Sequence, residues 1–156
     1  MAILEQVKGA KRLTQLLILL SFLITFVIAR FTVWLGVWLN IPSPNVIRGV
    51  HVHHLVPGII LILISGYMGL SFWRNHYLRW VMAILFGIGA ALTIDEFALW
   101  LYLSDVYWEK QGRYSIDAII VVAVLLIIAY IISEIQGHRT IRKIPLVSYF
   151  IKEPRV

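Results

Sequence analysis

Four long apolar runs constrain the fold of this chain more than any other feature of its sequence. Each run is close to the roughly 20 residues that an α-helix needs to cross a bilayer. None alternates between apolar and polar residues as the strands of a membrane barrel do, so helices are the expected form. The runs cover Thr14 to Leu39, His54 to Trp73, Tyr77 to Leu103 and Ser115 to Ser133.

Composition agrees with a membrane location and excludes several kinds of site. Of the 156 residues, 60% are hydrophobic and 14% are charged, whereas soluble domains are about a quarter charged. The absence of cysteine excludes disulfides, thiolate zinc sites, iron–sulfur clusters and thiol nucleophiles. We therefore expect one all-α domain, an integral membrane four-helix bundle. Its helices are expected over roughly 14–39, 51–73, 77–104 and 115–134, with a short interfacial segment over 136–156.

The distribution of Lys and Arg predicts the orientation of the bundle. Cytoplasmic segments of membrane proteins carry an excess of these residues. With the N-terminus inside, ten basic residues face the cytoplasm, three lie in outer loops and Arg30 lies within the membrane. Both termini are therefore expected to be cytoplasmic. The net charge of +6 suits membrane lipids as partners, and no nucleic acid is needed to explain it.

Polar side chains gather in the outer half of the predicted bundle. Such groups are costly in a membrane and usually serve a function. Folding each helical hairpin about the centre of its loop brings histidines, acids and one arginine to similar heights. These residues are His51, His53, His54, Arg30, Asp95, Glu96 and Asp117.

A metal site is one interpretation of this cluster. In a helix that begins before residue 51, His51 and His54 are three positions apart and share a face. Imidazoles and carboxylates on facing helices commonly hold metals. We expect the ligands of a divalent ion to be His51, His54 and Glu96, with zinc favoured over iron or manganese. Asp95 lies about 100° from Glu96 on a helix, so it is expected to pair with Arg30, although either acid can face the histidines.

Each of these residues also has a structural interpretation. Histidines near the start of a helix are often simply solvated. A buried pair of Arg30 and an acid can serve only to fix the register of the helices. Asp117 follows Ser115 near a helix N-terminus, where the helix dipole favours a carboxylate and Ser is a good cap.

The segment DEFALWLYLSDVYWEKQGRYSIDA, preceded by HVHHLVPGI, resembles a family of small bacterial integral membrane proteins without an established activity. The resemblance extends from Arg48 through Asp117. It implies a multi-pass protein of the bacterial inner (cytoplasmic) membrane. It implies no reaction, so no catalytic role is transferred from it.

Three functions fit the pattern. The first is metal-dependent hydrolysis of lipids or lipid-linked substrates at the outer surface, where the metal activates water. Asp95 or Asp117 would act as the general base, and Arg48 and Arg113 would bind the substrate headgroup. The second is proton- or ion-coupled transport through the intramembrane charges, with a homo-oligomer completing the pathway. The third is an accessory scaffold subunit whose polar cluster is structural.

Overall fold

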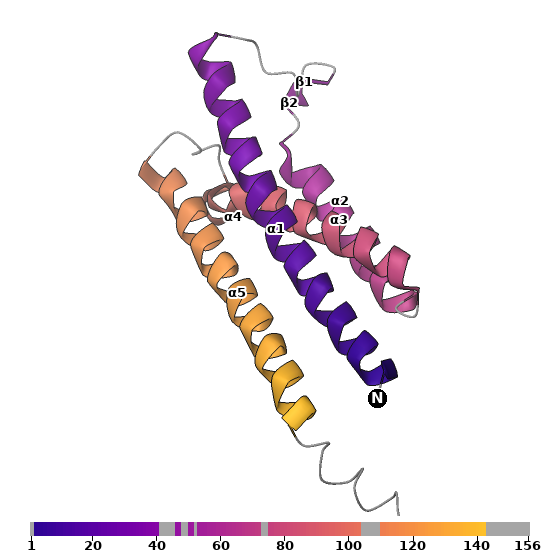
Figure 1. Ribbon diagram of the computed structural model, residues 1–156. Helices are drawn as coiled ribbons and strands as arrows, with labels where there is room; N and C mark the ends of the chain where they lie inside the picture. Colours follow the sequence, from indigo (N-terminus) through magenta and orange to yellow (C-terminus); the bar gives the residue numbers. More distant parts are fainter. Residues whose placement is uncertain are drawn as a thin grey trace, which may run out of the picture.

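The computed structural model describes the backbone of residues 2–40, 46–47, 50–51, 53–72, 75–103 and 110–142, and the side chains of residues 9–40, 53–72, 75–103, 110 and 112–135. Almost all of this part of the chain is helical (Figure 1), which confirms the all-α expectation. Its β structure is one antiparallel pair of two-residue strands. The elements are α1 (Ala2–Trp38), β1 (Val46–Ile47), β2 (Val50–His51), α2 (Leu55–Ser71), α3 (His76–Asp95), α4 (Phe97–Tyr102), the 3-10 helix η1 (Lys110–Gly112) and α5 (Arg113–Arg142).

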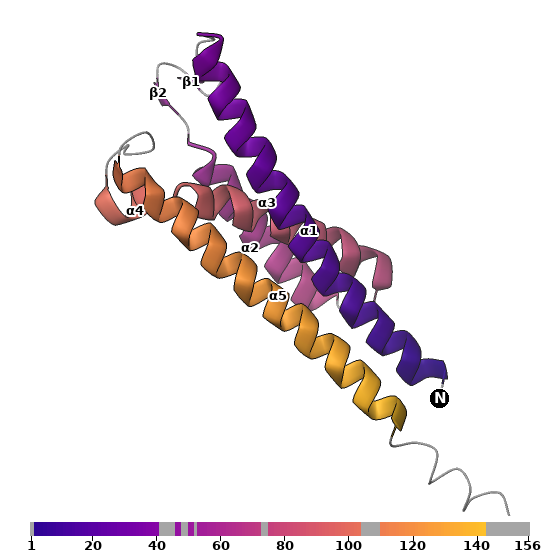
Figure 2. The same cartoon turned by 60° about the vertical axis from the view of Figure 1, so that its left-hand side comes forward.

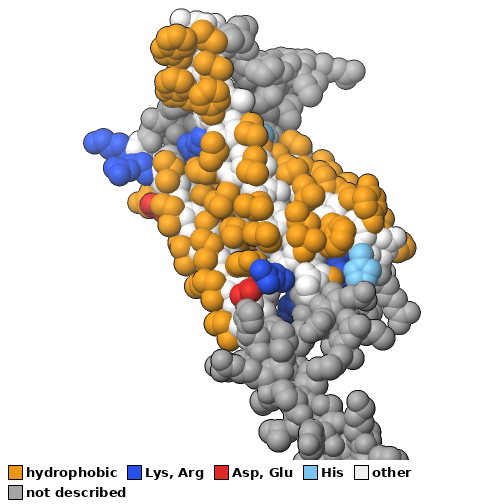
Figure 3. All heavy atoms as spheres, in the orientation of Figure 1, with side chains coloured by type: hydrophobic (Ala, Val, Ile, Leu, Met, Phe, Trp, Pro, Cys, Tyr) orange, Lys and Arg blue, Asp and Glu red, His pale blue; other side chains and the backbone are white. Residues whose placement is uncertain are grey.

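Three of the described helices are long and apolar enough to cross a membrane. They are Gly9–Trp38 within α1, the whole of α3, and Arg113–Ile135 within α5, whereas α2 is a shorter apolar helix of 17 residues. Hydrophobic side chains cover most of the described surface in Figure 3, and charged side chains lie towards its ends. This surface is typical of a protein whose helices contact lipid.

The central element is α3, which packs against both α1 and α2 (Figures 1 and 2). In the apolar stretch of α3, 33% of the residues are buried inside the protein, compared with 11% in the apolar stretches of α1 and α5. A small apolar core of Phe22, Ala91 and Ile119 joins α1, α3 and α5. The start of α1 and the end of α5 lie at the same end of the molecule (Figure 1).

Two glycines allow α3 to approach its neighbours closely on opposite sides. A Cβ atom at Gly87 would meet Ser21 of α1 and would lie 2.5 Å from the Ile18 carbonyl oxygen. A Cβ atom at Gly89 would lie 2.8 Å from the Gly58 carbonyl oxygen of α2. Positions two apart on a helix differ by about 200°, so this spacing directs one glycine to each neighbour. Small residues at such contacts are typical of helix packing in membranes.

The first turn of α2 differs from the expectation. The helix begins at Leu55 rather than near residue 51, and His51 lies in β2. Pro57 explains the difference, because in a longer helix its ring would clash with the carbonyl group of His53. In the observed helix Pro57 occupies the first turn, where proline is tolerated.

The other end of the chain also differs from the expectation. Helix α5 extends to Arg142, so residues 136–142 continue this helix rather than forming a separate interfacial segment. The remainder of that predicted segment, 143–156, lies outside the described residues.

Candidate functional site

A break between α3 and α4 positions two consecutive acids. The predicted helix over 77–104 is interrupted at Glu96, whose φ of −104° and ψ of 25° end α3 and precede α4. Such a break frees backbone groups that need new partners. Arg30 Nη2 donates to the main-chain carbonyl of Asp95 at 3.3 Å, and the Ala98 N–H donates to Ser115 Oγ at 3.0 Å. The break is therefore supported by side chains from α1 and α5.

Asp95 is fully buried. Its carboxylate contacts Arg30 of α1 and His54, the residue that precedes α2. Its Oδ1 atom accepts a hydrogen bond from Arg30 Nε at 2.5 Å. Its Oδ2 atom lies 3.1 Å from His54 Nε2, just before α2. Charge-assisted contacts of this kind are stronger than neutral hydrogen bonds.

Glu96 joins α4 to the start of α2. Its Oε2 atom accepts a hydrogen bond from the Leu55 N–H at 3.0 Å, at the first residue of α2. Its Oε1 atom lies 3.1 Å from His53 Nδ1 and 3.3 Å from His54 Nδ1. The carboxylate thus supplies the cap that His54 does not provide through its own side chain, and its charge suits the positive end of the α2 dipole.

His54 is the bridge of this arrangement, because its two ring nitrogens face two different carboxylates. A neutral imidazole carries one N–H, and the nitrogen without hydrogen is an acceptor that cannot bond an ionised carboxylate. For His54 to form a hydrogen bond with both carboxylates, the group of one neutral imidazole and two ionised acids must gain one proton. This proton is held either by the ring or by one of the acids. We call Arg30, His53, His54, Asp95 and Glu96 the polar network.

The polar network is deeply buried at its acids and partly open at its cations. The side chain of Asp95 is 0% exposed and that of Glu96 is 6% exposed, whereas Arg30 is 23% and His53 is 25% exposed. Ser21 and Ser65 donate to carbonyl groups of their own helices, so their hydroxyl hydrogens are not directed towards the network. His54, at 18% exposed, is also partly open, so the exposed part of the network consists of its three basic side chains.

Five of the residues singled out in the sequence lie together in this network: Arg30, His53, His54, Asp95 and Glu96. Of these five, His53 contacts Glu96 although only His51, His54 and Glu96 were expected to be metal ligands. The expected pairing of His51 with His54 on one helical face does not occur, because α2 begins after both residues. The side chain of His51 and the whole of Arg48 lie outside the described residues.

Asp117 and Arg113 lie apart from the polar network. Both line a surface cleft of about 540 Å³ at the start of α5, together with Tyr102, Lys110 and Tyr114. Among the described residues, Asp117 makes no hydrogen bond or ion pair with the network. Its expected role as a base beside the histidines is not supported by this placement.

The donor set of the network does not form a ready metal site. Among the described side chains, no group of three or more His, Asp or Glu residues is placed to hold a metal ion. Both acids are already engaged by Arg30 and by the Leu55 N–H. The chain matches no known family model, no curated protein and no solved structure.

Proposed function

We propose that this chain is a multi-span membrane protein in which the polar network binds and exchanges a proton as part of proton-coupled transport. The observation that carries the proposal is the position of His54, with Nε2 at 3.1 Å from Asp95 and Nδ1 at 3.3 Å from Glu96. Ionisable groups within membrane helices commonly belong to proton relays.

For its topology, we propose four membrane-spanning helices with both termini in the bacterial cytoplasm. Helix α2 has 17 residues, or about 26 Å at 1.5 Å per residue, which approaches the hydrocarbon thickness of about 30 Å. With α3 and α4 forming one interrupted span, the polar network lies towards the outer side. The excess of Lys and Arg near the start of α1 and the end of α5 supports this orientation.

Charge balance gives the bound proton a means of coupling. With His54 protonated, two cations in the network balance the carboxylates of Asp95 and Glu96. Loss of the proton leaves one uncompensated negative charge in a region where such a charge is expensive. A second cation, or a movement that admits water, is then required. Proton release is thereby linked to cation entry or to rearrangement around the helix break.

The route for the proton begins at His53. Its ring contacts Glu96 and is partly exposed, so it can pass a proton between the surface and the buried acids. From Asp95 towards the start of α3, the next buried cluster is the apolar core of Phe22, Ala91 and Ile119, whose side chains cannot carry a proton. Transfer across the whole membrane therefore requires a rearrangement or a second copy of the chain.

The test is proton flux in liposomes that contain the purified protein and an internal pH-sensitive dye. An imposed pH gradient should produce flux in the wild type, and its dependence on Na⁺ or K⁺ outside should reveal a coupled cation. His54→Gln and Asp95→Asn should each reduce the rate by tenfold or more, on the order of the loss of one proton-transfer group.

The matched control is Tyr77→Phe, which removes an exposed hydroxyl group on α3 outside the network. It should leave the flux unchanged. A folded wild type without flux under any gradient would contradict the transport proposal. If His54→Gln alters only thermal stability, the network has the scaffold role instead.

A second candidate is metal-dependent hydrolysis of lipids or lipid-linked substrates. It is favoured by one observation, the convergence of His53 Nδ1 and His54 Nδ1 on the same oxygen of Glu96 at 3.1 and 3.3 Å. Because no described group of three is placed to hold a metal ion, these side chains would have to move as well as lose their ring protons to accept zinc, iron or manganese. Elemental mass spectrometry of the untagged protein tests this candidate: about one metal per chain, lost in the His53→Ala/His54→Ala variant, would favour it over proton exchange.

A further inference from the structure

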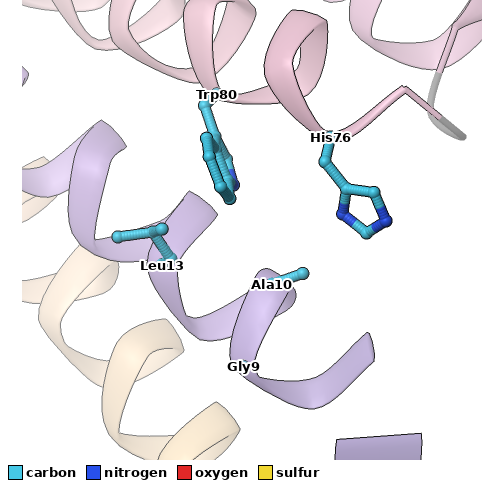
Figure 4. A pocket seen from close by; sticks show the side chains of 5 residues that line it. All are labelled: Gly9, Ala10, Leu13, His76 and Trp80. Carbon is cyan, nitrogen blue, oxygen red and sulfur yellow. The ribbon is translucent and has the colours of Figure 1, made fainter. Parts of the chain in front are cut away.

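A groove lies between α1 and α3 at the end of the molecule where α1 begins. Its volume is about 410 Å³, and its walls come from Gly9, Ala10 and Leu13 on one side and His76 and Trp80 on the other (Figure 4). Gly9 and Ala10 leave the wall of α1 low, and a Cβ atom at Gly9 would meet nothing within 4 Å. Most of the lining is apolar, so the groove suits a hydrocarbon chain.

Hydrogen-bond donors gather on the α3 side of this groove. Within the described part of the chain, Nε1 of the wall residue Trp80 and Nε of the neighbouring Arg79 are both buried without a hydrogen-bond partner. Arg79 Nη2 donates to His76 Nδ1 at 2.8 Å, because Arg has no acceptor atom. The neutral ring of His76 then carries its hydrogen on Nε2. Buried donors without acceptors are costly, so a ligand rich in acceptors is favoured here.

The charges near the groove are mainly positive. Lys11, Arg12 and Arg79 lie on the first turns of the apolar part of α1 and of α3. Among the described side chains, the acid at this end is Glu134, which forms a 2.7 Å ion pair with Arg12. In addition, α3 begins at His76, so the positive end of its dipole lies at the same rim. An anion with an attached apolar chain is complementary to this combination.

We propose that the groove binds one anionic phospholipid. Its phosphodiester oxygens accept hydrogen bonds from Trp80, Arg79 and His76, and one acyl chain lies along Leu13. A phosphodiester supplies acceptors and negative charge together, which matches the unpaired donors and the basic rim. This site lies at the opposite end of α3 from the polar network, so it does not depend on proton exchange.

The test is native mass spectrometry of the detergent-purified full chain, titrated with phosphatidylglycerol and, separately, with phosphatidylcholine. We expect one phosphatidylglycerol to be retained per chain, at lower concentration than phosphatidylcholine. Trp80→Phe keeps an aromatic side chain, although a smaller one, and removes the donor, so the affinity should fall about three- to tenfold. Gly9→Leu should abolish retention, since its side chain would fill the groove.

Two matched variants separate a specific site from general loss of structure. A Cβ atom at Gly36 also meets nothing within 4 Å, so Gly36→Leu adds the same bulk to α1 away from the groove. Trp100→Phe removes an exposed indole N–H at the other end of the bundle. Both should retain the lipid like the wild type. Equal lipid retention in Gly9→Leu and Gly36→Leu, or equal affinity for the two lipids, would overturn the proposal.

Discussion

Asp95 has no exposed surface, so its negative charge depends on compensation by Arg30 and His54. Removing one partner of a buried ion pair leaves the other charge unpaired in a region of low dielectric constant. We therefore expect Asp95→Asn or Arg30→Gln alone to lower the free energy of unfolding by about 3 kcal/mol. The double variant should lose less than the sum of the two, because it leaves neither charge unpaired. Thermal unfolding of the four proteins in one detergent measures this difference.

A surface ion pair provides the control for that cycle. Arg12 and Glu134 are also in contact, but the side chain of Arg12 is 53% exposed. Exposed pairs contribute little to stability, so Arg12→Gln should leave the unfolding temperature almost unchanged. Additive losses from Arg30→Gln and Asp95→Asn would show that the two side chains are not coupled.

Residue chemistry predicts the acids of the network better than its histidines. Arg30, Asp95 and Glu96 stand out in the sequence because a charge within an apolar run is costly wherever its helix lies. For the histidines, the outcome depends on where α2 begins. A start before residue 51 selects His51 and His54, whereas the observed start at Leu55 leaves His53 and His54 free to approach Glu96 from the preceding turn. Pro57 is the signal in the sequence that distinguishes these two possibilities.

At the scale of elements, the packing of α3 depends on Gly87 and Gly89. Gly89→Ala would place a methyl group 2.8 Å from the Gly58 carbonyl oxygen and 3.0 Å from the Ile62 nitrogen. Both neighbours are backbone atoms, so the helices must separate. We expect the free energy of unfolding to fall by about 1–3 kcal/mol, as in other overpacked contacts. Unfolding in detergent micelles measures the loss.

Gly66 of α2 provides the matched substitution, since a Cβ atom there meets nothing within 4 Å. Gly66→Ala should be neutral or should stabilise the protein by up to about 1 kcal/mol through helix propensity. If Gly89→Ala proves as stable as Gly66→Ala, the close approach of α2 and α3 would be wrong.

The apolar runs locate the centres of the helices, but they do not give the ends or the interruptions, since α1 begins at Ala2 rather than near residue 14. Hydropathy detects the whole segment from His76 through Tyr102, because Asp95 and Glu96 are only two polar residues within it. The break at Glu96 depends on contacts from distant parts of the chain. Ser115 accepts the freed N–H of Ala98, and Arg30 donates to the freed carbonyl of Asp95. No local periodicity carries this information.

For the whole molecule, charge is divided between two ends of one central helix. At one end of α3 the polar network joins Arg30 of α1 to the approach of α2, and at the other His76 and Trp80 line the groove beside α1. The apolar middle of α3 separates these two regions. The network and the groove are therefore separate sites that share two helices, α1 and α3.

The network and the groove can face opposite sides of the membrane only if α2 and α3 both cross it. Because the sequence contains no cysteine, single introduced cysteines test this topology directly. Single cysteines at exposed positions would replace Lys11, Asn40, Asn75, Leu103 and Ile135. In intact spheroplasts, a membrane-impermeant maleimide should label only Asn40→Cys and Leu103→Cys, with the other three labelled after lysis. If α2 did not cross, the chain would cross three times instead of four. Labelling of Asn75→Cys and Ile135→Cys from outside, with protection of Leu103→Cys, would establish that three-span topology and contradict the proposed orientation.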